Sequence, residues 1–141
     1  MIYKDREDAG RLLAGKLIRY NKGDVIVLAL PRGGVPVGAQ VARALKCPLD
    51  IVIPRKLGAP GNPELAIGAA GPGGIRFLDE ELIKRLRVSE EYIEEETERQ
   101  LLEMDRRLKR YRGDLPPLQI HDKIVILVDD GIATGSTMVA A

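Results

Sequence analysis

The sequence predicts an α/β fold in which a doubly wound, mainly parallel sheet carries a β-hairpin flap. Two apolar runs lead to this prediction, V-I-V-L-A-L at Val25–Leu30 and I-V-I-L-V at Ile124–Val128. Runs of this kind, without polar interruption, are typical of strands buried on both faces in a parallel sheet. A helical pattern after the first run leads to a third apolar stretch at the spacing of a βαβ unit. The length of 141 residues suits a single domain over 1–141.

The first elements alternate between helix and strand. Asp5–Tyr20 has apolar residues at helical spacing and is followed by the first strand, Val25–Leu30. Val35–Lys46 is again helical by its pattern, and Pro36 falls in its first turn, where proline is tolerated. Leu49–Ile53 is the third strand.

The middle of the chain predicts a flap. The stretch Pro54–Glu64 is rich in glycine and proline and is expected to form a loop that carries Arg55 and Lys56. Leu65–Ala70 and Ile75–Leu78 then flank the sequence G-P-G-G, which indicates a β-hairpin. A mobile hairpin of this kind suits a lid that excludes water from a site.

Two helices are expected after the flap. Asp79–Arg87 is a short helix by pattern, and Ser89 is placed to cap a long one that runs to about Arg112. The narrow apolar stripe of the long helix suits packing within the domain, and part of it suits the seam of a homodimer.

The composition excludes several classes of protein. Lys and Arg number 22 and Asp and Glu 21, and this balance provides no general attraction to nucleic acid or to a membrane surface. Cys47 is the single cysteine, so an internal disulfide and a cysteine-based metal cluster are excluded. Without a signal peptide or an apolar run of membrane-spanning length, we expect a cytoplasmic protein.

The stretch after Ile124–Val128 combines features of a sugar-phosphate site. Two carboxylates come directly after the strand, a loop of small residues follows, and a helix is expected to open at the end of that loop. Backbone N–H groups of such a loop and of the first helical turn can bind a phosphate, while the carboxylates accept hydrogen bonds from ribose hydroxyls. The candidate binding residues are Asp129, Asp130, Gly131, Ala133, Thr134, Gly135, Ser136 and Thr137.

A second loop is expected beside this one. If the strand order is flavodoxin-like, Val25–Leu30 and Ile124–Val128 are neighbours, and the loops at their carboxyl ends face one another across a crevice. The first of these loops carries Arg32 and Gly33. The guanidinium group of Arg32 can bind a pyrophosphate through two N–H groups, and Gly33 lets the backbone approach it closely. The alternative is an ordinary βα turn with a solvent-facing arginine.

The apolar run, the acid pair, the small loop and T-G-S-T together resemble the phosphoribosyl-pyrophosphate signature of the type I phosphoribosyltransferases. The resemblance implies a Mg²⁺-dependent glycosyltransferase of the pentosyltransferase type that acts in nucleotide metabolism. Its substrates would be phosphoribosyl pyrophosphate and a nitrogen-base acceptor. No direct protein ligand to the metal is implied, since Mg²⁺ would be held through substrate oxygens and water near Asp129 and Asp130.

The resemblance also suggests roles for the flap. Arg55 is a candidate for closing over the substrate, and Lys56 and Glu64 are candidate catalytic residues, with a solvated loop glutamate as the alternative for Glu64. Ala133 stands where the 6-oxopurine enzymes of the family carry an acid, so a 6-oxopurine acceptor is not expected. A non-catalytic sensor that binds phosphoribosyl pyrophosphate or a nucleotide on the same fold remains the alternative function.

Members of the family continue beyond the phosphate loop with further strands. The sheet is therefore expected to be incomplete at the C-terminal end of this stretch, and residues 1–141 alone are expected to be inactive.

Overall fold

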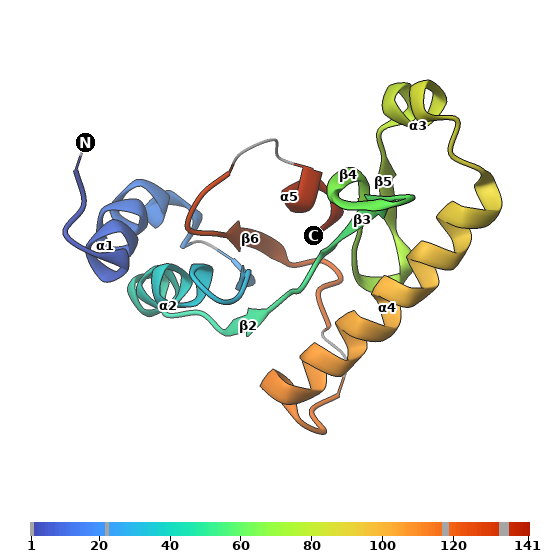
Figure 1. The fold of residues 1–141 in the computed structure, drawn as a ribbon. Coiled ribbons are helices and arrows are strands. Elements are labelled where there is room, and N and C mark those ends of the chain that lie inside the picture. Colours follow the sequence, from blue (N-terminus) through green and yellow to red (C-terminus); the bar gives the residue numbers. More distant parts are fainter. Residues whose placement is uncertain (1, 22, 117–118, 133–135) are drawn as a thin grey trace. The chain divides into compact units, whose positions relative to one another are not determined.

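A computed structural model describes residues 2–21, 23–116, 119–132 and 136–141 (Figure 1). The chain forms two compact units, residues 1–52 with 115–132 and residues 53–114 with 133–141. The first contains a parallel sheet and the second an antiparallel sheet, so the predicted α/β class with a hairpin flap is confirmed. None of the helices among the described residues has both the length and the apolar character needed to cross a lipid bilayer.

The first unit is built on three parallel strands in the order β2-β1-β6. The predicted neighbours therefore pair, and Ala29 stands opposite Val128 at their carboxyl ends. The elements of this unit are α1 (Arg6–Leu17), η1 (Ile18–Tyr20), β1 (Val25–Ala29), α2 (Gly34–Leu45), β2 (Leu49–Ile51) and β6 (Ile124–Val128).

Helix α2 is packed against both the sheet and α1. A Cβ built on Gly38 would lie 2.9 Å from Cβ of Ala29, and one built on Gly10 of α1 would lie 2.8 Å from Cβ of Gln40. These close approaches need small residues, because a larger side chain would push the layers apart. The core that results contains Ala14, Val27, Val37, Val41, Ala42, Leu45 and Val128.

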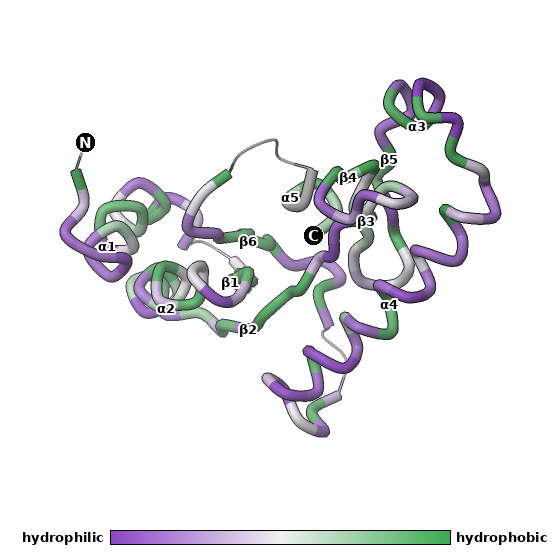
Figure 2. Tube along the Cα trace, in the orientation of Figure 1, coloured by the Kyte–Doolittle hydropathy of each residue, from purple (hydrophilic) through white to green (hydrophobic). Residues whose placement is uncertain are grey.

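The two predicted core strands differ in burial. Every residue of β1 is buried, as expected, and Figure 2 shows an apolar segment there. Strand β6 is buried only at Val128, and Ile124 is 40% exposed, so the prediction that this strand is buried on both faces was wrong. Strand β6 is an edge strand among the described residues, with β1 as its partner on one side.

The second unit contains an antiparallel sheet in the order β3-β4-β5. Its hairpin turns through residues 71–75, so the hairpin predicted from G-P-G-G is confirmed. The elements of this unit are β3 (Arg55–Ala59), β4 (Asn62–Ala70), η2 (Pro72–Gly74), β5 (Arg76–Leu78), α3 (Glu80–Leu86), α4 (Glu90–Arg112) and α5 (Ser136–Ala140).

The stretch Pro54–Glu64 is not the loop that its composition predicted. Residues 55–59 form strand β3, and the chain reverses at Pro60 and Gly61, whose φ of 72° favours glycine. Leu57 is fully buried, while register shifts occur on both sides of Gly58. A short strand interrupted by a bulge lacks the regular alternation by which strands are recognised in a sequence, and this explains the error.

Helix α4 begins as predicted, with the Ser89 hydroxyl accepting a hydrogen bond from the N–H of Tyr92 at 3.1 Å. Its face toward the sheet includes Ile93, which joins a core with Leu57, Ala59, Ile67 and Ala70. The apolar stripe predicted for this helix runs from Ile93 to Tyr111, and the prediction was only partly right, because Tyr111 is 52% exposed. In Figure 2 much of the trace of α4 has the colour of hydrophilic residues.

Candidate functional site

The candidate site starts where β1 and β6 end side by side. The N–H of Leu30 donates to the carbonyl of Val128 at 2.9 Å, which extends the pairing to the last residue before the acid pair. Because the strands are parallel, the loops that follow them leave from the same edge of the sheet.

Glycines allow the loop after β1 to contact the acid pair. A Cβ on Gly34 would lie 2.8 Å from the carbonyl oxygen of Val128 and 3.0 Å from Cα of Asp129. A Cβ on Gly33 would overlap the Oδ2 atom of Asp130. The structure thus brings together two loops that the strand order predicted to be neighbours.

The two carboxylates have different surroundings. The N–H of Asp130 donates to Oδ1 of Asp129 at 2.8 Å. Partial burial raises the pKa of Asp129, whereas hydrogen bonds from Arg6 lower the pKa of Asp130. The pair therefore offers one carboxylate that is held ionised and one that is less readily ionised.

Arg6 is a member of this cluster that the sequence did not reveal. Its Nε and Nη2 atoms lie 3.1 Å and 2.9 Å from Oδ2 of Asp130. The two residues are 124 positions apart in the sequence, and Arg6 stands among the acids Asp5, Glu7 and Asp8, which suggest local pairing instead. No sequence pattern connects it with Asp130.

Arg32 lies in the same loop as Gly33. It is exposed, and within the described part of the chain its guanidinium pairs with no carboxylate. The peptide bond between Pro31 and Arg32 is cis, and the carbonyl of Arg32 accepts a hydrogen bond from the N–H of Val35 at 3.3 Å. The side chain of the predicted clamp residue therefore lies exposed in the loop after β1.

The predicted residues of the flap lie in the second unit. Arg55 and Lys56 are on β3 and Glu64 is on β4, where Lys56 and Glu64 are exposed. The Nε atom of Arg55 donates to Oε1 of Gln100 on α4 at 3.0 Å, and partial burial lowers the pKa of Arg55. Gln100 in turn donates to Glu96, a buried carboxylate of α4.

The remaining predicted residues belong to the phosphate loop. Gly131 is exposed, and a Cβ built on it would meet no atom of the described residues within 4 Å. Ala133, Thr134 and Gly135 lie outside the described residues. Helix α5 opens with Ser136 and Thr137, so the helix predicted after the loop is confirmed.

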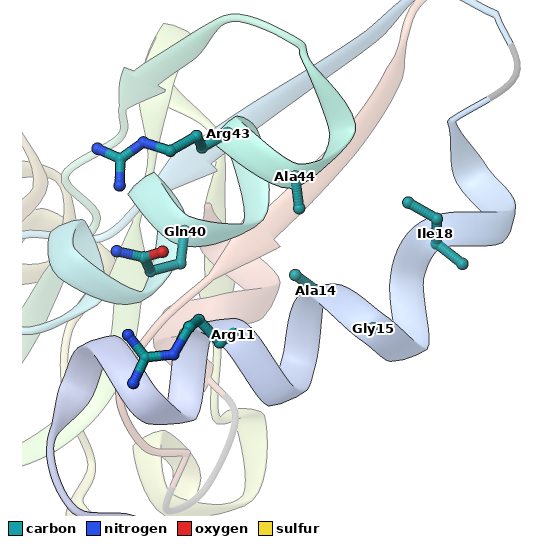
Figure 3. A pocket seen from close by; sticks show the side chains of 7 residues that line it. All are labelled: Arg11, Ala14, Gly15, Ile18, Gln40, Arg43 and Ala44. Carbon is teal, nitrogen blue, oxygen red and sulfur yellow. The ribbon is translucent and has the colours of Figure 1, made fainter.

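The first unit also has a shallow cavity of about 390 Å³ between α1 and α2 (Figure 3). Ala14 and Ala44 provide small apolar side chains beside the backbone of Gly15, and Arg11, Gln40 and Arg43 add polar groups. None of the predicted site residues lines this cavity. Arg11, which does line it, is on the same helix as Arg6, so a substitution of Arg11 is a suitable control for a substitution of Arg6.

Comparisons with known proteins agree with this arrangement. A family model described as phosphoribosyl transferase domain matches residues 1–141. Proteins named "Putative phosphoribosyl transferase" from two strains of Mycobacterium tuberculosis, CDC 1551 / Oshkosh and ATCC 25618 / H37Rv, are each 43% identical over 140 residues. That alignment covers 99% of this chain and 32% of each relative, so the chain spans about a third of their length.

A solved structure shows the same fold. The crystal structure of TT1426 from Thermus thermophilus matches with a TM-score of 0.78 and 45% sequence identity, over 99% of this chain and 66% of that one. With the paired acids at the end of β6, the glycines that contact them and a family match over residues 1–141, the chain belongs to the phosphoribosyl transferase domain family.

Proposed function

We propose that this domain binds phosphoribosyl pyrophosphate with Mg²⁺ and transfers the phosphoribosyl group to a nitrogen-base acceptor. The observation that carries the proposal is the contact of Gly33 with Asp130 at the carboxyl ends of two neighbouring parallel strands. Ligands of open α/β sheets bind at this edge, where two loops can hold different parts of one molecule.

The acid pair would bind the ribose. Asp129 and Asp130 would accept hydrogen bonds from the two vicinal hydroxyls, each a charge-assisted bond when the carboxylate is ionised. The 5′-phosphate would be bound by the loop from Ala133 to Thr137, a role that rests on the family signature and on the helix that opens at Ser136.

The pyrophosphate would lie against the other loop. Arg32 would contribute a guanidinium and Gly33 a close backbone approach, with Arg55 and Lys56 as candidates for closing over the phosphates. Glu64 is the candidate base that would accept the proton lost by the acceptor nitrogen.

The residues present fit Mg²⁺ that is held through substrate oxygens and water. Asp129 and Asp130 provide the carboxylate oxygens that this ion prefers, but Asp130 is also engaged by Arg6. The described residues contain no group of three His, Cys, Asp or Glu side chains that could hold a metal ion. When bound, Mg²⁺ would neutralise charge on the pyrophosphate, and the two aspartates would orient its water ligands.

In the reaction, a ring nitrogen of the acceptor forms a bond to C1 of the ribose while the bond from C1 to the pyrophosphate oxygen breaks. The pyrophosphate leaves with the electron pair, and the acceptor nitrogen loses its proton. The protein's part is to position both reactants and to stabilise charge in an oxocarbenium-like transition state.

The acceptor is proposed to be other than a 6-oxopurine. The side chain of Ala133 cannot form a hydrogen bond with a base. A site without a hydrogen-bonding side chain at this position selects poorly for a base with a polar edge, such as a 6-oxopurine. The test is pyrophosphate release by the full-length protein with Mg²⁺, phosphoribosyl pyrophosphate and each nucleobase in turn. We expect release with an acceptor other than hypoxanthine or guanine, and efficient turnover of either of these two would contradict the proposal.

A non-catalytic sensor of phosphoribosyl pyrophosphate or a nucleotide is the second candidate. One observation favours it: Arg55 is engaged by Gln100 within the second unit, so a candidate flap cation already has a structural partner. Tight binding of phosphoribosyl pyrophosphate without turnover of any base would support this function over the transferase.

A further inference from the structure

Arg6 is held at a defined position by the start of α1. The carboxylate of Asp5 accepts a hydrogen bond from the N–H of Asp8 at 2.7 Å and so caps the helix. Arg6 is the first residue of that helix. Its side chain therefore projects from a fixed point, although it lies near the N-terminal end of the chain.

The guanidinium makes both of its hydrogen bonds to the same oxygen. Nε and Nη2 donate to Oδ2 of Asp130, and Oδ2 is also the atom that Gly33 approaches. A Cβ on Gly33 would lie 3.0 Å from Nε of Arg6. Residues from α1, from the loop after β1 and from the loop after β6 thus meet around one oxygen, Oδ2 of Asp130.

A purely stabilising role explains this ion pair poorly. The side chains of Arg6 and Asp130 are 59% and 36% exposed, and exposed pairs contribute little to folding because water and salt screen them. Arg6 also has acids much nearer in sequence, such as Asp8, which instead pairs with Arg11. Its pairing with Asp130 brings a cation to the substrate edge of the sheet.

We propose that Arg6 is a positioning residue of the sugar-phosphate site, which holds Asp130 through Oδ2 so that Oδ1 faces the ribose hydroxyl. This inference rests on the proposed function. The same contact also lowers the pKa of Asp130, so the carboxylate stays ionised to a more acidic pH than an ordinary aspartate.

The first part of the test needs no ligand. The Nε–H resonance of Arg6 in the NMR spectrum of the full-length protein reports its hydrogen bond to Asp130. We expect a signal in the wild type whose chemical shift changes in Asp130→Ala, which has no side-chain acceptor, and is unchanged in Arg11→Gln. A chemical shift that is unchanged in Asp130→Ala would overturn the ion pair.

The second part measures binding of phosphoribosyl pyrophosphate by calorimetry with Mg²⁺. Arg6→Gln should bind roughly tenfold more weakly, since an unheld carboxylate loses much of a charge-assisted hydrogen bond. Arg6→Lys should recover part of the loss, and Arg11→Gln should bind like the wild type. In the double variant with Asp130→Asn, removal of Arg6 should have little further effect.

The outcomes separate this inference from the proposed function. A wild type that does not bind phosphoribosyl pyrophosphate would overturn the proposed function and the ligand role of Arg6 with it. Normal wild-type binding that is also unchanged in Arg6→Gln would overturn the inference alone. Equal losses in Arg6→Gln and Arg6→Lys, with additive effects of Asp130→Asn, would likewise contradict positioning through this ion pair.

Discussion

At the scale of single residues, the cluster of Arg6, Gly33 and Asp130 determines how closely the two loops of the first unit approach. Asp130 was predicted from its place after an apolar strand, and Gly33 from its place in the neighbouring loop. Both predictions depend only on the residues near each position in the sequence, and the structure contains the two strands on which they were based. Arg6 could not be predicted, because a contact over 124 residues leaves no periodic or spacing signal in one sequence.

Gly33→Ala should destabilise the protein. The added methyl group would overlap Oδ2 of Asp130 and approach Nε of Arg6, so the loop or the ion pair must move. We expect a loss of about 1–3 kcal/mol in the free energy of unfolding, as for other overpacked sites. Urea denaturation of the full-length protein measures it, with Gly131→Ala as the matched control because its methyl group would meet no atom within 4 Å in the part of the chain that the structure describes. Equal stability of the two variants would show that the approach of the loops is not tight.

At the scale of elements, the predicted strands and helices of the first unit were correct within a few residues, because long apolar runs and helical periodicity are strong signals. The errors fell on β3 and on the burial of β6. Strand β3 is short and bulged, and burial of a strand depends on what covers it rather than on its own composition. The buried Glu96 of α4 was also missed, since a glutamate in an acidic helical segment ordinarily faces water.

The packing of α1 on α2 can be tested within one helix. Gly10→Ala should destabilise the protein, because the methyl group would lie 2.8 Å from the carbonyl oxygen of Val37. Gly15→Ala should stabilise it by about 0.5–1 kcal/mol, since alanine favours the helix and its methyl group meets nothing within 4 Å. Thermal unfolding of the two variants checks this difference, and a Gly10→Ala variant as stable as Gly15→Ala would contradict the observed crossing.

Helix α4 should contribute to acid sensitivity through Glu103. Hydrogen bonds from Arg106 and Arg107 lower the pKa of Glu103 from 4.5 to about 2. A lowered carboxylate pKa adds stability that is present above pH 4.5 and disappears as the pH falls toward 2. Melting temperatures across this range should depend less on pH in Glu103→Gln than in the wild type. The exposed Glu98 of the same helix gives the control variant, Glu98→Gln, and identical profiles for Glu103→Gln and the wild type would argue against the contacts with the arginines.

At the scale of the whole molecule, the candidate residues fall into two groups. Arg6, Arg32, Gly33, Asp129 and Asp130 belong to the first unit, and Arg55, Lys56 and Glu64 to the second. Strand order predicted the first group apart from Arg6, since parallel neighbours bring their carboxyl-end loops together. The second group was assigned by resemblance to a flexible loop of the family. Such a resemblance suggests a role for a residue but does not predict its contacts in this chain. The hydrogen bond from Arg55 to Gln100, for example, could not be predicted in this way.

The most direct test of the account is the affinity of the full-length protein for phosphoribosyl pyrophosphate in the presence of Mg²⁺, measured by calorimetry. Asp129→Asn and Asp130→Asn should each weaken binding by roughly tenfold or more, because hydrogen bonds to charged groups contribute about 1.5–3 kcal/mol. Asp105→Asn, which changes an exposed aspartate of α4, should bind like the wild type. Binding by all three variants with the affinity of the wild type would contradict the assignment of the acid pair to the ribose.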